Sequence, residues 1–482
     1  MTDDDVGAPF RATARRLVEV IAADDPNLLS HAGVDLSPAI EQSFFLRLRR
    51  PRATPRAPTL RSFARVARHA AGSVRGTAHP RRGDVVALVV NPAQARIFAP
   101  VAIALRERGI TTFAAYESHA RSARTGSEST RLVDRIRPDV AARLVVFEAR
   151  ARLRVSTATR RFDDVVDADV ARRMRRTVIE IIGRAALYAA ALDDLASHSP
   201  SLLVGFNEVG RWSRILPAVG RRHGIPSLDV AHAEAVDVAA IEGAGYDRFA
   251  VFGRRSADVL ERAGVDPDRI AITGAPRFDA LVRRHGQSTL PPRERRVVFA
   301  SQWLGGAMTP TVKERTADAA LAVAAAVAPS ELVVQRHPIE RDDIAVGLAS
   351  RAPEGVTARI GSTGNLHGEL DGAWLLVTGW SNAVFEAALS NVPAITVNAT
   401  GGRPPMTFAE EGLALGAVDA DSAAVAARAL RSDDAWLAAV RRAKPPLEEH
   451  LGPLDGRAAE RVADLAESMI EAKAARTERP RR

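Results

Sequence analysis

The most informative part of the chain reads Trp374-Leu-Leu-Val-Thr-Gly-Trp-Ser-Asn-Ala-Val-Phe-Glu-Ala-Ala-Leu-Ser-Asn-Val-Pro-Ala-Ile-Thr-Val397. Its apolar run 375–377 is short, as in a buried strand. Gly379 then allows the backbone to turn sharply. Pro393 prevents a helix from continuing, and 394–397 has the composition of a second buried strand. The stretch therefore predicts a strand, a helix and a second strand.

The start of this helix is the first candidate binding site. Ser381 and Asn382 are residue types that cap helices, and Glu386 follows one turn later. A helix that opens at the carboxyl end of a parallel strand presents free N–H groups and a positive dipole end, which favour a phosphate or diphosphate. The same residues are equally consistent with an ordinary βαβ unit that binds no ligand.

Composition limits the class of protein. A chain of 482 residues exceeds one ordinary core and suits two domains, and 46% hydrophobic with 26% charged residues is typical of a globular protein. The absence of Cys excludes disulfides, thiol catalysis and Cys-based metal sites. No apolar run is long enough to span a membrane, and no signal peptide follows the acidic residues 1–5. We expect a cytoplasmic protein.

Positive charge is concentrated in one segment. The net charge is +9, yet residues 42–83 contain eleven Arg and no acidic residue, so the rest of the chain is close to neutral. Residues 47–59 read as a basic linker. Residues 60–76 read as a basic amphipathic helix with Arg61, Arg65 and Arg68 on one face, suited to an anionic membrane surface. Alternatively, this helix packs on its own domain with a solvated Arg face.

Strands and helices alternate from Val85 onward, with a break near residue 290. This pattern predicts an α/β protein with two doubly wound parallel sheets, whose ligand site lies at the carboxyl ends of the strands, in a cleft between the domains. Strands are expected at 85–90, 111–115, 144–147, 201–206, 227–231, 248–252, 269–273, 297–301, 332–335, 357–360 and 413–418. The expected domains are a helical, Arg-rich extension (1–83, with 1–46 loosely packed), two Rossmann-like domains (84–290 and 294–445), and a crossover helix with a basic tail (446–482).

Polar residues follow two strands of the first domain. Asn207 and Glu208 come after one strand, and His232 and Glu234 come after another. A general base needs an imidazole or a carboxylate near the attacking hydroxyl, and His232, Glu234 or Glu208 has the required chemistry. Polar groups that only complete the hydrogen bonds of a strand end give the same pattern.

The second domain repeats this arrangement. An Arg or His at such a position can neutralise a departing phosphate, and a carboxylate in the following helix can accept hydrogen bonds from a ribose diol. A turn with solvated polar groups is the simpler alternative. The strand-end residues here are Ser301, Gln302, Arg336, His337, Gly379, Ser381 and Asn382, with Glu386 one turn on.

Several common catalytic motifs are missing. The sequence has no G-x-x-x-x-G-K-[ST] loop and no G-x-S-x-G elbow, and Asn91-Pro-Ala-Gln94 follows the first strand in place of G-x-G-x-x-G. His, Asp and Glu do not occur at metal-ligand spacing. These absences argue against an ATPase, a dinucleotide oxidoreductase and an α/β-hydrolase, and we expect no metal and no cofactor.

Four segments together resemble a known group of enzymes. Phe252-Gly-Arg254 with Gly274-Ala-Pro-Arg-Phe-Asp279, Ala300-Ser-Gln302, Arg336-His-Pro338, and Gly379-Trp-Ser-Asn382 with Glu386-Ala387 are similar to motifs of GT-B enzymes that build surface polysaccharide. The chain looks like capsule and teichoic-acid transferases of the CDP-glycerol glycerophosphotransferase type. The wider similarity reaches the UDP-N-acetylglucosamine 2-epimerase fold group. The resemblance covers roughly 200–470.

This resemblance implies a GT-B fold and a metal-independent transfer of a sugar, or a polyol phosphate, from a nucleotide donor to a cell-envelope glycan or lipid-linked acceptor. The C-terminal domain would hold the donor, with His337 and Ser381 at its phosphates and Glu386 at its ribose. The N-terminal domain would hold the acceptor near Asn207 and Glu208. His232 matches the family's catalytic His-Gly position, where this chain has Ala233. His232, Glu234 and His337 are the expected catalytic residues; Ser301, Gln302, Arg336, Gly379 and Asn382 complete the expected donor site.

Two other functions stay open. The first is a 2-epimerase that acts on a UDP-sugar without an acceptor, although the epimerase segments GTRPE and HRxEN are absent. The second is a non-catalytic protein that binds polyanions through residues 47–82. No recognisable nucleic-acid fold accompanies that segment, so we expect no specific nucleic-acid partner.

Overall fold

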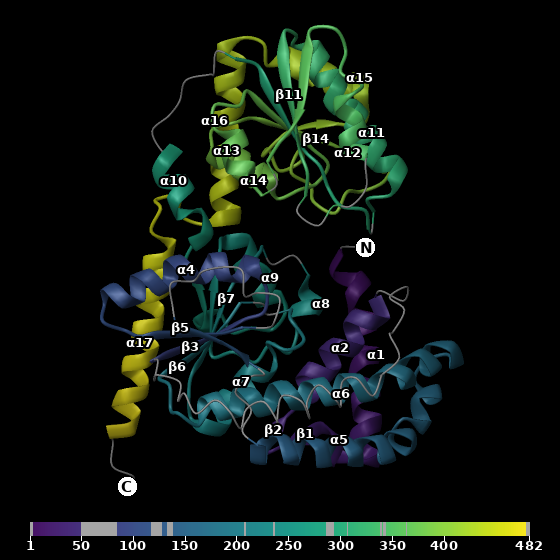
Figure 1. The fold of residues 1–482 in the computed structure, drawn as a ribbon, viewed down its shortest axis with the longest axis vertical. Coiled ribbons are helices and arrows are strands. Elements are labelled where there is room, and N and C mark those ends of the chain that lie inside the picture. Colours follow the sequence, from purple (N-terminus) through teal and green to yellow (C-terminus); the bar gives the residue numbers. More distant parts are fainter. Residues whose placement is uncertain are drawn as a thin grey trace. The chain divides into compact units, whose positions relative to one another are not determined.

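The computed structural model describes residues 3–49, 84–116, 128–132, 138–206, 209–234, 237–285, 294–305, 307–337, 340, 344–362 and 364–478. The chain forms two compact units. Unit 1 comprises Met1–Arg277 and Arg457–Arg482, and unit 2 comprises Phe278–Gly456 (Figure 1). The bounds of these units differ from those of the expected domains. Unit 1 includes the N-terminal helices, and the C-terminal segment from Arg457 onward also belongs to it.

Unit 1 contains a parallel sheet whose described strands are ordered β5-β4-β3-β6-β7-β8-β9. The strands are β3 (Val85–Val89), β4 (Thr112–Tyr116), β5 (Glu128–Arg131), β6 (Leu202–Gly205), β7 (Ser227–Val230), β8 (Arg248–Val251) and β9 (Ile270–Ile272). The helices are α1 (Asp3–Asp24), α2 (Ser37–Arg49), α4 (Pro92–Glu107), α5 (Pro138–Ala158), α6 (Ala168–Ala196), α7 (Ile215–His223), α8 (Val238–Ile241), α9 (Arg254–Arg262) and α17 (Ala458–Glu478). A short hairpin joins β1 (Ser30–His31) to β2 (Val34–Asp35).

Unit 2 contains a second parallel sheet, with its described strands ordered β12-β11-β10-β13-β14-β15. The strands are β10 (Arg296–Ala300), β11 (Ser330–Gln335), β12 (Val356–Ile360), β13 (Leu375–Thr378), β14 (Ala394–Val397) and β15 (Leu415–Ala417). The helices are α10 (Asp279–His285), α11 (Pro310–Ala326), α12 (Ile344–Ala349), α13 (Leu366–Leu370), α14 (Ala383–Leu389), α15 (Ala420–Ala429) and α16 (Asp433–Leu451). The two predicted parallel α/β sheets are confirmed, and the 374–397 stretch forms the expected strand, helix and strand.

One expected strand is wrong. Residues 144–147 lie inside α5 and not in the sheet. The buried residues described in this helix recur at helical spacing: Val140, Ala141, Leu144, Ala151 and Ala158. A four-residue apolar window does not distinguish a strand from one turn of a buried helix. The strand that does pair with β4 is the polar β5, which hydrophobicity alone could not reveal.

The expected loose packing of residues 1–46 is also wrong. Leu17, Ile21, Phe44 and Phe45 are fully buried and belong to the same hydrophobic core as α6 and the sheet. In Figure 1, α1 and α2 (purple) lie beside α5 and α6, which agrees with the contacts between these helices. The N-terminal helices are therefore part of unit 1. Residues 47–49 of the expected basic linker are wrong, because they form the end of α2. The rest of the linker and the predicted basic helix at 60–76 lie outside the described residues.

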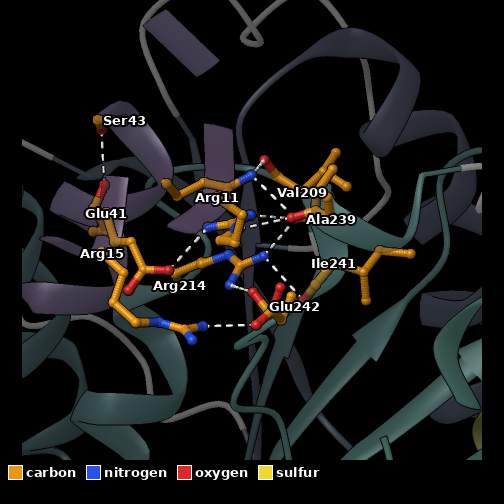
Figure 2. A network of polar contacts seen from close by, with 12 residues as sticks. Arg11, Arg15, Glu41, Ser43, Val209, Arg214, Ala239, Ile241 and Glu242 are labelled. Atoms are coloured by element: carbon orange, nitrogen blue, oxygen red, sulfur yellow. Dashed lines mark hydrogen bonds and ion pairs between the residues drawn. The ribbon is translucent and has the colours of Figure 1, made fainter. Parts of the chain in front are cut away.

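A buried arginine joins α1 to the segment around α8 (Figure 2). The Nε of Arg11 donates to the carbonyl of Ala239 at 2.7 Å, and its Nη2 donates to the Gln42 amide oxygen and the Ala240 carbonyl. Arg214 donates to the carbonyls of Ala240 and Glu242, both at 2.6 Å. Two guanidinium groups thus bind the backbone carbonyls at the end of α8, which a four-residue helix cannot satisfy by itself.

The C-terminal helix returns to unit 1. Ala459, Val462, Ala463 and Ala466 of α17 share a buried cluster with Phe98 of α4 and the strands of the unit 1 sheet. None of the helices in the described part of the chain is long and apolar enough to cross a membrane.

Candidate functional site

The predicted residues of unit 2 lie at one edge of its sheet. Strand β10 is hydrogen-bonded to β11 on one side and to β13 on the other, all in parallel. Their carboxyl ends therefore lie side by side and bring Ser301, Arg336 and Gly379 to the same edge. This edge is where ligands bind in open α/β sheets.

Glu340 organises the first half of this edge. Its carboxylate accepts from the Ser301 hydroxyl at 3.1 Å and from the His337 backbone N–H at 3.1 Å. It also forms an ion pair of 2.8 Å with Lys313 of α11, in which both side chains are buried. Arg336 donates to the Glu340 carbonyl at 3.3 Å. Glu340 therefore fixes the turn that carries Arg336 and His337 against the end of β10.

Gln302 organises the second half. Its side-chain oxygen accepts from the backbone N–H of Trp380 at 3.0 Å. A Cβ atom on Gly379 would lie only 2.5 Å from the same oxygen, so this position has room for glycine alone unless Gln302 moves. Thr378 anchors the end of β13 by donating to the carbonyl of Ala300 at 2.8 Å. Gln302 and Gly379 are thus in direct contact, as expected for residues of one site.

Helix α14 follows this turn. The Ser381 hydroxyl accepts from the N–H of Ala383, the first residue of the helix, at 3.2 Å, so Ser381 satisfies one free N–H of the helix start from the position before the N-cap. Asn382 is the exposed N-cap residue, and its side chain makes no cap hydrogen bond. Glu386 is half-buried and lies 3.7 Å from the imidazole of His367 on α13. Because α14 has only seven residues, its dipole is short, and side chains must supply most of the attraction for an anion.

Burial lowers the pKa of His337 below its usual range. The charge of Glu340 raises that pKa, but by less than the loss of hydration lowers it, and the charge of Lys313 lowers it further. His337 is therefore neutral near pH 7 in the unliganded protein. A phosphate beside it would favour the protonated form.

A cavity of about 250 Å³ opens beside Gly379, at the carboxyl ends of β14 and β15. Thr396, Asn398, Met406 and Thr407 line it with Gly379. Its size suits a heterocyclic base or a pentose, and it is below the ~300–1,000 Å³ of typical ligand pockets. Gly379 lines the cavity; the other predicted donor-site residues do not.

The predicted residues of unit 1 are less well connected. His232 is partly buried just after β7, and the Ala231 N–H before it bonds to the Ala250 carbonyl. The Glu234 carboxylate is 4% exposed and lies 3.8 Å from Arg255 of α9. His232 and Glu234 thus occupy the carboxyl end of β7, as predicted. Asn207 and Glu208 lie outside the described residues.

The turn after β3 has a structural function. The Asn91 side chain accepts from the Gln94 N–H at 3.0 Å, and the Gln94 side chain accepts from the Val90 N–H at 2.7 Å. These reciprocal bonds cap α4 with side chains, where a dinucleotide-binding turn would use glycines. Among the described residues, no three His, Asp or Glu side chains form a group that could hold a metal ion.

Sequence reasoning missed three residues of the unit 2 edge, namely Lys313, Glu340 and His367. A signal for the first was available, because Lys occurs at only three positions and Lys313 lies in an Ala-rich, largely buried helix. A buried Lys requires a paired carboxylate. The sequence could not indicate which carboxylate, because the partner comes from the far end of the next strand.

Solved structures with a similar fold are UDP-N-acetylglucosamine 2-epimerases. That of the Neisseria meningitidis enzyme bound to UDP-GlcNAc has 10% identity, covers 80% of this chain and 99% of its own, and has a TM-score of 0.50. Another 2-epimerase has 14% identity, covers 83% and 99%, and has a TM-score of 0.50. The wall teichoic acid polymerase TagF has 12% identity, covers 86% and 96%, and has a TM-score of 0.46.

No protein-family model and no curated protein matches the chain. At 10–14% identity, the likeness of these structures concerns the fold alone. It agrees with the two parallel sheets and their flanking helices. The chain therefore has the two-domain GT-B α/β fold that its sequence motifs predict.

Proposed function

We propose that this protein is a metal-independent glycosyltransferase that uses a nucleotide-activated sugar or polyol phosphate and whose unit 2 binds the donor. The observation that carries the proposal is the Glu340 cluster. A buried carboxylate holds Ser301 and the backbone of His337 in place, while the polar ends of three adjacent strands meet at one edge. A preorganised cationic and hydroxyl-bearing edge suits a diphosphate.

The proposed donor position follows from the same geometry. The diphosphate lies over His337, Arg336 and Ser381, and the base or ribose enters the cavity beside Gly379. Glu386 accepts from a ribose hydroxyl. The related N. meningitidis structure is bound to UDP-GlcNAc, which makes a nucleoside diphosphate sugar the natural first ligand to test.

A thermal-shift panel of UDP, CDP, CMP, GDP and dTDP tests this proposal. A nucleotide at about 100 times its Kd stabilises the protein by about 2.7 kcal/mol, so one member should raise the melting temperature. Ser381→Ala and His337→Ala should abolish that rise relative to each variant's own unliganded value. Ser350→Ala, an exposed serine of unit 2, should keep it. A full rise in both site variants would contradict the proposed donor position.

Nucleotide binding should also take up protons. The pKa of His337 is lowered in the free protein and rises when a phosphate lies beside it, so the imidazole gains a proton on binding at pH values between the two. Affinity should therefore increase as the pH falls from the raised pKa of the bound form to the lowered pKa of the free protein. Calorimetry in buffers of different ionisation enthalpy measures the uptake, and His337→Gln should remove it. Equal uptake by His337→Gln would place the titrating group elsewhere.

The product of the reaction distinguishes a transferase from a 2-epimerase. If the protein is a transferase, it releases the nucleotide only when an acceptor is present, and His232 or Glu234 is the proposed general base. If it is a 2-epimerase, it converts UDP-N-acetylglucosamine to the manno epimer with no acceptor. The fold likeness to two 2-epimerases makes this second assay necessary.

We further propose that the Arg-rich segment 47–82 holds the enzyme at an anionic membrane surface. Liposome sedimentation at varied salt tests this proposal.

A further inference from the structure

A second, larger cavity lies in unit 1. Its volume is about 700 Å³, and it is formed by one face of α5 and by residues between Asp25 and Ala32, which include strand β1 of the β1–β2 hairpin. In Figure 1, α5 runs beside this hairpin, and the rings of His31 and Phe147 meet edge to face at 4.8 Å. The volume lies within the ~300–1,000 Å³ of ligand pockets. None of the residues predicted for catalysis or donor binding lines it.

The α5 wall carries a row of arginines. Arg143, Arg150 and Arg154 all line the cavity and lie on one face of the helix, spread over about 16 Å at 1.5 Å per residue. Arg143 pairs with Asp139, and Arg154 pairs with Asp25 across the cavity. Arg150 has no ion-pair or hydrogen-bond partner among the residues that the structure describes. Three Arg and one Asp, Asp25, are the charged residues that line the cavity, so its lining has an excess of positive charge.

The opposite wall contains an unsatisfied imidazole. His31 lines the cavity, is only 6% exposed, and its Nε2 has no hydrogen-bond partner in the described part of the chain. Buried polar atoms of this kind normally have a partner, so this nitrogen, on a residue that lines the cavity, is a candidate hydrogen-bonding group for a ligand. Burial lowers the pKa of His31, and Arg143 lowers it further. The imidazole is therefore neutral, and one of its nitrogens can donate a hydrogen bond while the other accepts one.

The remaining lining combines polar and apolar groups. Asn27 and Ser30 are exposed at the rim, while Leu28 and Phe147 supply apolar and aromatic surface. A ligand that fits has negative charges spaced along its length, hydroxyls for the polar rim and carbon–hydrogen faces for Phe147. A lone phosphate would leave most of the cavity and two of the three arginines unused.

We propose that this cavity binds an acidic oligosaccharide, with its charged groups along Arg143, Arg150 and Arg154. The identification as a glycan rests on the proposed function, in which the enzyme extends an envelope polymer. The site would then hold a part of the acceptor or product chain in unit 1, whereas the residues assigned to the donor belong to unit 2. The positive charge and the unpartnered imidazole do not depend on that function.

Binding of a fluorescent galacturonic acid tetramer to the full chain, at about 150 mM salt, tests the proposal. Residues 47–82 contain eleven Arg and no acidic residue, which is a second place where an anion can bind, so the measurement compares two matched variants. Arg150→Gln removes a cavity arginine, whereas Arg152→Gln, two residues along the same helix, breaks only the surface pair with Glu148. Arg150→Gln should weaken binding about tenfold, and Arg152→Gln should leave it unchanged. A neutral glucose tetramer should not bind.

Equal affinities of the two variants would overturn the proposal, as would Arg150-dependent binding of a DNA oligonucleotide of the same charge. Competition by millimolar inorganic phosphate as effective as by the unlabelled tetramer would show an anion site without glycan recognition, and would also overturn it. The nucleotide panel is run on the same samples. If no nucleotide raises the melting temperature but the tetramer still binds through Arg150, only the proposed donor site is refuted. If a nucleotide raises the melting temperature but tetramer binding does not depend on Arg150, only the proposed glycan site is refuted.

Discussion

Replacing Arg11 by Ala is expected to destabilise unit 1 by about 3–5 kcal/mol, the usual effect of breaking a buried charged network by removing one partner. Arg11 is 2% exposed, pairs with Glu41 at 3.3 Å, and lies 4.2 Å from the ring centre of Phe45. Its loss removes the donors that reach the carbonyls of Ala239 and Ala240 (Figure 2). Hydrogen exchange should therefore accelerate in α1 and in residues 237–242.

Arg15 provides the matched control one helical turn later. It pairs with Glu242 at 2.7 Å, but the two side chains are 49% and 38% exposed, so solvent screens the pair. Arg15→Ala should cost no more than about 1 kcal/mol. Chemical denaturation followed by segment-resolved hydrogen exchange measures both variants, because the two units need not unfold together. A similar small effect in both variants would show that α1 is not an integral part of unit 1.

Replacing Glu340 by Ala should destabilise unit 2 by a similar amount, about 3–5 kcal/mol, because Lys313 is left buried without its carboxylate. Ser301 and the His337 backbone N–H lose their acceptor in the same variant. Nucleotide binding should therefore weaken along with stability. Denaturation and the nucleotide panel, run on the same preparation, measure the two effects.

A double variant separates the two effects. Glu340→Leu with Lys313→Met replaces the pair by apolar side chains and should recover most of the stability, since well-packed apolar residues often substitute for a buried ion pair. It should not recover nucleotide binding, because no acceptor for Ser301 and His337 returns. Asp318→Ala is the control on the same helix, where it breaks the exposed pair with Arg351 and should cost about 1 kcal/mol or less. Normal nucleotide binding by the double variant would exclude a positioning role for Glu340.

The sequence by itself determined the α/β alternation of both units. Short apolar runs such as 375–377, followed by glycine or capping residues and ended by Pro393, specify strand, turn and helix through contacts within a few residues. Polar residues after those strands were located for the same reason, since parallel strands end at a common edge. Ser301, Arg336 and Gly379 are identified by this local signal alone, without their neighbours in the fold.

Only the tertiary structure decided which residues hold that edge together and which segments complete the core. The Lys313–Glu340 pair and the contacts of Arg11 with Ala239 join residues far apart in the sequence, and no local pattern encodes such partners. Residues 138–158 form a helix with one buried face, because α6 and α1 pack against that face. Burial depends on what packs against a segment, so the α5 cavity and its arginines emerge only when distant parts of the chain meet.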